Sequence, residues 1–240
     1  MMRTQILKLA AACAALGSLA AATPAFAQDE EAEEAEGPIT ISGGIALVSD
    51  YRFRGVSLSD KDFAVQPTLT VKHDSGLYLG VWGSNIADNA GDDLEIDIFG
   101  GFSGGDTVTY DIGATYYIYP GVSSFNYVEL TGKLGTTVGP LTIGGQLSYV
   151  PSQDNTADTD NIYVATNAAI GIPNTPVTLT ASVGYEDGFF GNEKLDWSLG
   201  ASASFSGFTL GVSYVDTDRR STFAFGDSKA TAVFTLSYAF

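Results

Sequence analysis

The chain has 240 residues, of which 45% are hydrophobic and 16% charged, and 28 acids against 11 bases give a formal charge of −17. Such a chain lacks the basic face with which a nucleic-acid binder displaces counterions from phosphates, so no nucleic-acid partner is expected. A single cysteine excludes a disulfide framework and a cysteine-based metal centre. An aromatic content of 12% argues against a disordered acidic chain.

Residues 1–27 have the three parts of a secretory signal peptide. Arg3 and Lys8 supply the positive charge, residues 9–22 form an apolar stretch of small residues, and Ala-Phe-Ala at 25–27 is a cleavage site. We therefore expect export and removal of this segment. A cysteine-free mature chain then fits the bacterial envelope.

Residues 28–38 form a short acidic arm ahead of the ordered domain. Positions 29–36 read Asp-Glu-Glu-Ala-Glu-Glu-Ala-Glu, a run of charge that cannot bury apolar surface and is expected to be a flexible, solvated arm. The folded domain is expected over residues 39–240.

From Ile39 onward, apolar residues recur at every second position. Ile39, Ile41, Ile45 and Leu47 alternate with Thr, Ser, Gly and Ala, which places apolar groups on one face of a strand and small or polar groups on the other. The same pattern predicts twelve strands, near residues 39–54, 63–72, 77–86, 93–102, 107–119, 125–135, 141–150, 161–172, 177–185, 195–205, 208–215 and 229–240.

The connections between these strands alternate between short turns and longer polar loops. That asymmetry is typical of outer-membrane barrels, whose turns face the periplasm. An even number of strands brings both termini to the short-turn end and closes the sheet, so that no open edge leaves backbone groups unpaired in lipid. The prediction is an all-β protein with a closed antiparallel transmembrane β-barrel in the outer membrane.

A soluble β-sandwich or lipocalin-like barrel is the alternative, because its strands also alternate. The membrane barrel is favoured because its strands carry few Lys and Glu residues and because aromatic residues gather at strand ends, where they suit interfacial girdles. These aromatics are Tyr51, Phe53, Tyr149, Tyr185 and Tyr214 near the long loops, and Phe102, Phe205, Phe208 and Tyr238 near the short turns. The chain ends on Phe240 in alternating register, which resembles the signal read by the outer-membrane assembly machinery.

Residues 49–57, Ser-Asp-Tyr-Arg-Phe-Arg-Gly-Val-Ser, followed by Gln66-Pro67, resemble the N-terminal signature of the TorF family of porins. Shorter similar stretches lie at 94–97, 110–113, 117–121, 127–130 and 147–149, so the resemblance spans most of the mature chain. It implies an outer-membrane channel and supplies no catalytic residues.

If the apolar face meets lipid, the charged residues point into the lumen. Arg52, Arg54 and Asp50 are expected on one face near the extracellular mouth, and Asp93, Glu95 and Asp97 as a ladder of carboxylates at a similar height. Asp111, Glu129 and Lys133 complete the predicted pore-lining set, and Glu186, Asp196, Lys72 and Lys229 add further inward charge. Because inward acids outnumber bases, the sequence predicts a weakly cation-preferring pore for passive diffusion of small solutes or ions.

A second interpretation of the same charges stays open. Eight strands give a filled barrel and sixteen give an open channel, so in a twelve-stranded barrel Arg52 and Arg54 could pair with the carboxylates and plug the lumen. The protein would then be a structural or adhesion barrel with functional extracellular loops.

The sequence does not predict an enzyme. Gly101-Phe102-Ser103-Gly104-Gly105 matches G-x-S-x-G, but here the motif ends a strand at a hairpin and lacks the strand–turn–helix context, while His73 lies on another turn. No catalytic group, cofactor or metal is expected. The expected partners are outer-membrane lipid and lipopolysaccharide, the assembly machinery through Phe240, and small solutes.

Overall fold

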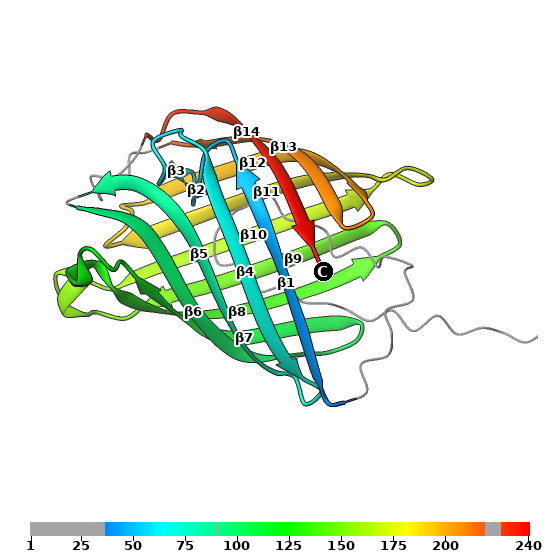
Figure 1. Ribbon diagram of the computed structural model, residues 1–240, viewed down its shortest axis with the longest axis horizontal. Helices are drawn as coiled ribbons and strands as arrows, with labels where there is room; N and C mark the ends of the chain where they lie inside the picture. The colour runs from blue at the N-terminus through cyan, green and yellow to red at the C-terminus, as the bar shows by residue number, and fades with distance from the viewer. Residues whose placement is uncertain (1–36, 90, 219–226) are drawn as a thin grey trace, which may run out of the picture.

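The computed structural model describes residues 37–89, 91–218 and 227–240, which form a closed barrel of twelve antiparallel strands (Figure 1). The predicted signal peptide and most of the acidic arm lie outside the described residues. The barrel strands are β1 (Ile39–Val48), β4 (Ala64–His73), β5 (Leu77–Asn89), β6 (Asp92–Gly104), β7 (Val108–Ile118), β8 (Tyr127–Val138), β9 (Leu141–Val150), β10 (Asn161–Gly171), β11 (Val177–Gly188), β12 (Lys194–Phe205), β13 (Phe208–Thr217) and β14 (Thr231–Ala239). The predicted all-β closed barrel is confirmed.

The barrel closes between its first and last strands. β1 pairs with β14 from Gly44 opposite Ala239 to Val48 opposite Thr235, and its other edge pairs with β4 along its whole length. Each described barrel strand therefore has a hydrogen-bonded neighbour on both sides. Closure matters because a backbone N–H or C=O left unpaired in hydrocarbon costs several kcal/mol, on the order of 2–7.

The side chains divide between the two faces as the alternation predicts. Large apolar residues cover the outside, and Leu79, Ile112 and Leu199 are more than 60% exposed. Charged residues fill the inside, where Glu95 and Glu186 are each 1% exposed. This arrangement is the reverse of a soluble barrel and is that of a barrel surrounded by lipid.

The turns at one end of the barrel are tight. The strands β12 and β13 are joined by only Ser206 and Gly207, with Phe205 paired directly to Phe208. Both turn residues have positive φ angles, 45° and 79°. Two-residue hairpins with this geometry match the right-handed twist of the strands that they join.

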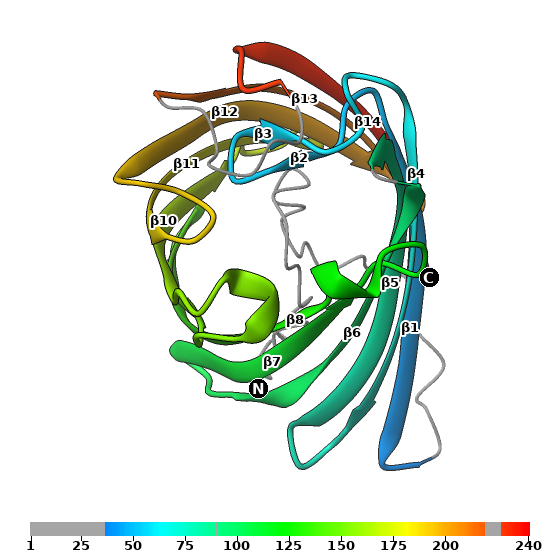
Figure 2. The same cartoon turned by 90° about the vertical axis from the view of Figure 1, so that its left-hand side faces the viewer.

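The first predicted strand is wrong at its end. The alternation predicts a strand over residues 39–54, but β1 ends at Val48 and the chain turns inward. A small hairpin of β2 (Arg52–Phe53) and β3 (Val56–Ser57) follows, and it lies inside the ring of strands when the barrel is viewed along its axis (Figure 2). Tyr51 is consequently buried inside the barrel and is no part of an interfacial girdle.

Two short 3-10 helices, η1 (Ser123–Phe125) and η2 (Asp154–Thr156), lie in connections at the same end as this hairpin. Among the described residues, no helix has the length and apolar character to cross a membrane.

If the outward apolar face meets lipid, a charged substitution on it should lower the free energy of unfolding, and more so near the bilayer midplane than near its surface. Leu199, in the middle of β12, and Leu77, at the first position of β5, are 62% and 59% exposed. Leu199→Arg should lower the free energy of unfolding in lipid vesicles by about 2–4 kcal/mol, because arginine at the bilayer midplane is poorly solvated. Leu77→Arg, near the interface, should cost no more than about 1 kcal/mol. Equal costs at the two sites would contradict a lipid-facing surface.

Candidate functional site

Residues 49–63, here called the inner loop, fold back into the barrel from the end of β1. In Figure 2 its hairpin lies inside the ring of strands, next to the wall formed by β12, β13 and β14. Asp50, Arg52, Arg54 and Ser57 are each at most 3% exposed, although all four are polar. Burial of so many polar groups is tolerated only where each finds partners, so their contacts define the candidate site.

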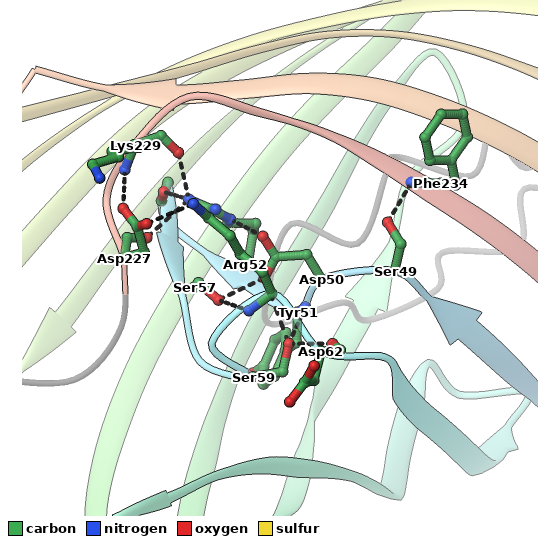
Figure 3. Close-up of polar contacts among 12 residues, drawn as sticks. Ser49, Asp50, Tyr51, Arg52, Ser57, Ser59, Asp62, Asp227, Lys229 and Phe234 are labelled. Carbon is green, nitrogen blue, oxygen red and sulfur yellow. Dashed lines mark hydrogen bonds and ion pairs between the residues drawn. The ribbon is translucent and has the colours of Figure 1, made fainter.

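Arg52 fastens the base of the hairpin. Its Nε lies 2.6 Å from Asp50 Oδ2, and the hydroxyl of Ser57 donates to Asp50 Oδ1, also at 2.6 Å. Arg52 Nη1 donates to the carbonyls of Gly55, Asp227 and Lys229 at 2.9 to 3.1 Å (Figure 3). The Arg52 side chain thus closes the hairpin and ties it to the connection between β13 and β14.

Arg54 forms the tip of the hairpin and reaches the opposite wall. Its φ of 48° and that of Gly55, 86°, turn the chain sharply at this point. The guanidinium forms ion pairs with Glu129 on β8 and with Glu186 on β11, the second at 2.6 Å. Lys194 on β12 completes the cluster, with Nζ 2.8 Å from Glu186 and 2.5 Å from the carbonyl oxygen of Arg54.

The cluster contains two bases, Arg54 and Lys194, and two acids, Glu129 and Glu186. Burial alone would lower the pKa of Arg54, but attraction to Glu129 and Glu186 outweighs that effect and raises the pKa. Two aromatic rings enclose the guanidinium, Phe53 at 4.6 Å and Tyr163 at 4.2 Å from its carbon to the ring centre. The tip is therefore held by charge, hydrogen bonds and stacking together.

Two further contacts hold the inner loop. The hydroxyl of Tyr51 donates to Glu95 on β6 at 3.0 Å, and its ring centre lies 5.4 Å from that of Trp82 on β5. Nearer the surface, Lys61 pairs with Asp227 at 2.5 Å. The hydrogen bond from Lys61 lowers the pKa of Asp227 to about 2. The inner loop is thus attached to several sides of the barrel.

The carboxylate ladder on β6 differs from the prediction at one position. Glu95 and Asp97 are buried as expected, but Asp93 is exposed and its neighbour Asp92 is buried in its place. The pairing of β6 with β5 shifts register beyond Asn85, which interrupts the strict alternation on which the prediction for Asp93 depended.

The remaining predicted residues lie on the inner side of the barrel wall, nearer the short turns. Asp111 on β7 is 7% exposed and accepts a hydrogen bond from the Tyr78 hydroxyl at 2.9 Å. Lys133 on β8 is half-buried and stands directly opposite Asp111 in the pairing of the two strands. These two opposite charges therefore face one another across neighbouring strands.

Sequence reasoning missed three buried polar residues of the site. The predicted strand begins at residue 195 and so leaves out Lys194, and the sequence pattern does not single out Tyr163 or Asn161, which donates to Glu186 at 3.1 Å. The available signal for Lys194 was its alternating register with Asp196 and Ser198, which extends β12 by one residue.

The G-x-S-x-G segment has no nucleophile-elbow geometry. Ser103 lies within β6 next to a hairpin turn, and Nδ1 of His73 hydrogen-bonds to Ser75 in its own turn. Both residues are accounted for by the strand and the turns that contain them.

Several solved porins share this architecture. A KdgM porin superposes with a TM-score of 0.58 at 7% identity, covering 83% of this chain and 98% of that one. A NanC porin superposes with a TM-score of 0.54 at 11% identity, covering 84% and 99%. A KdgM porin solved with disordered oligogalacturonate gives a TM-score of 0.57 at 8% identity, covering 83% and 98%. The fold is thus that of outer-membrane porins.

Residues 32–240 match the sequence profile of the family described as "Bacterial protein of unknown function (Gcw_chp)". The chain belongs to this family. No curated protein matches the chain by sequence, and the resemblance to the TorF family is not confirmed by these comparisons.

The ion pairs of Arg54 generate a stability prediction. Arg54→Met leaves Glu129 buried without its base and should lower the free energy of unfolding by about 3–5 kcal/mol. Arg54→Met combined with Glu129→Gln should recover part of that loss, because the orphaned charge is gone. Urea unfolding in detergent micelles measures both.

Lys61→Met serves as the control, because the ion pair of Lys61 with Asp227 is partly exposed. It should cost no more than about 1 kcal/mol. A cost for Arg54→Met as small as that of Lys61→Met would mean that the Arg54 pairs do not hold the inner loop.

Proposed function

We propose that the protein is an outer-membrane porin-like channel that passes small solutes or ions by passive diffusion through a lumen narrowed by the inner loop. The observation that carries the proposal is the combination of an apolar exterior with a charged interior in a closed twelve-stranded barrel. The likeness in fold to the KdgM and NanC porins supports it. No catalysis is proposed.

The charges of the lumen support a weak preference for cations. The ion pairs of the inner loop neutralise Asp50 with Arg52, and Glu129 and Glu186 with Arg54 and Lys194. Within the described residues, no such ion pair involves the buried acids of β6, which are Asp92, Glu95 and Asp97. Because these acids have no base as an ion-pair partner in the described part of the chain, they are the groups that we propose favour cations over anions in a narrow passage.

The solute class proposed here differs from that of one similar porin. The KdgM porin was solved with oligogalacturonate, which is a polyanion. The acids of β6 would repel such a chain, so we propose small cations and neutral solutes for this protein.

A second candidate function is favoured by the inner loop itself. Arg52 and Arg54 attach the hairpin to both sides of the barrel, as a permanent plug would require. The protein would then be a structural or adhesion barrel with a closed lumen and functional extracellular loops.

The expected partners follow from the barrel surface. Lipid and lipopolysaccharide would contact the apolar exterior and the polar loops. Phe240 is 72% exposed at the end of the chain, where the assembly machinery would bind it.

Planar-bilayer recordings separate the two candidate functions. The channel proposal expects discrete conductance steps from the purified protein and a reversal potential that favours cations in a KCl gradient. Arg54→Ala should raise the single-channel conductance, because it removes both the anchor and the bulk of the hairpin tip. Lys61→Ala should leave the conductance unchanged.

Absence of conductance steps from both the natural protein and Arg54→Ala would contradict the channel proposal and support the closed barrel. Conductance with a reversal potential that favours anions would retain the channel and contradict the cation preference.

A further inference from the structure

Asp97, near the middle of β6, has a carboxylate oxygen that the fold leaves unsatisfied. Its side chain is 2% exposed, and Oδ1 has no hydrogen-bond partner among the described residues. A buried charged oxygen without a partner is costly, and native structures retain one where a ligand or another group supplies the missing contact.

Aromatic residues flank this carboxylate on both neighbouring strands. Asp97 pairs directly with Trp82 on β5 and with Tyr117 on β7. All three side chains are buried, so they point into the lumen at the same level of the barrel, where opposed residues have Cβ atoms about 4.5–5.5 Å apart. The Tyr117 ring stacks on Tyr127 with ring centres 4.4 Å apart. The carboxylate beside the Trp82 ring therefore offers the two interactions that favour an organic cation, which are ionic attraction and cation–π contact.

A small cavity adjoins the carboxylate. It has a volume of about 30 Å³, and Trp82, Phe99 and Tyr78 line it together with Asp97 and Asp111. That volume holds about two water molecules, which is also the heavy-atom count of a methylammonium ion. The cavity therefore has room for the charged end of an amine.

Glycines on the wall make room for the aromatic rings of the cavity. A Cβ at Gly80 would approach Phe99 Cζ to 2.3 Å, and a Cβ at Gly113 would approach the Tyr78 hydroxyl oxygen to 2.9 Å. The rings lie across backbone that carries no side chain, which keeps them inside the lumen beside Asp97.

The charges of the cavity leave room for one cation. Three charged residues line it, and Lys133 stands directly opposite Asp111 on the adjacent strand. Asp97 faces only aromatic residues in its own two pairings. A monovalent cation in the cavity would give Asp97 the partner of opposite charge that its two strand neighbours do not supply.

We propose that Asp97 and Trp82 bind the ammonium group of a small organic amine in this cavity of the lumen. The inference rests on the proposed channel function, since an amine would reach Asp97 through the lumen. Divalent metals suit the site less well, because the described residues contain no group of three His, Cys, Asp or Glu side chains placed to hold a metal ion.

Tryptophan fluorescence provides a test that needs no conduction. The chain has two tryptophans, so Trp197→Phe leaves Trp82 as the only reporter. Methylammonium chloride is titrated over roughly 1–100 mM, the range in which a ligand of two heavy atoms binds, into the purified full-length protein in detergent. We expect a saturable change in emission that potassium chloride at equal ionic strength and methanol at equal concentration do not produce.

Variants in the same background test the assigned residues. Asp97→Asn should weaken methylammonium binding at least tenfold, whereas Asp93→Asn, an exposed acid on the same strand, should leave it unchanged. Tyr117→Phe, at a residue outside the cavity lining, should also leave binding unchanged. Circular dichroism with thermal unfolding verifies that each variant is folded.

An emission change with potassium chloride or methanol that equals the change with methylammonium would overturn the proposal. So would the absence of any change in the folded parent, or unaltered binding in folded Asp97→Asn. Conductance without methylammonium binding would refute only the amine site, and binding without conductance would refute only the channel.

Discussion

The rest of the structure depends on one constraint, which is that hydrocarbon offers no hydrogen-bond partner. The twelve strands satisfy this constraint because each strand edge is hydrogen-bonded to a neighbouring strand, and the pairing of β1 with β14 closes the barrel. The same constraint sends charged side chains into the lumen, where they must satisfy one another. The cluster of Arg54, Glu129, Glu186 and Lys194 is the clearest result, because acids from two walls meet bases from the inner loop and from a third strand.

The inner loop divides the interior into regions of different character. Around its hairpin, Asp50 pairs with Arg52, and Glu129 and Glu186 pair with Arg54, so the loop is fixed in place there. Along β6, Glu95 accepts hydrogen bonds from the hydroxyls of Tyr51 and Tyr119, and Oδ1 of Asp97 has no hydrogen-bond partner within the described part of the chain. Under the proposed function, selectivity would arise from the β6 wall, and passage would be limited by the inner loop.

The barrel was predictable from sequence because lipid imposes alternation on every strand, and a period of two is a local signal. The inner loop was not, because residues 49–54 continue that alternation while their charges pair with residues far along the chain. Arg54 meets partners 75 and 132 positions away, which no local pattern encodes. The prediction for Asp93 was wrong for a local reason, because a shift in register between β5 and β6 moved the buried position to Asp92. The pore-lining role of the charged residues stays a prediction.

The most direct test of the central claim compares the two tryptophans in bilayers with brominated acyl chains. Trp197 lies on β12 between Leu195 and Leu199, on the outward-facing side of the alternation, whereas Trp82 is 8% exposed and faces the lumen. In single-tryptophan variants, Trp82→Phe and Trp197→Phe, bromine should quench the emission of Trp197 strongly and that of Trp82 weakly. Stronger quenching of Trp82 than of Trp197 would mean that the apolar face does not meet lipid.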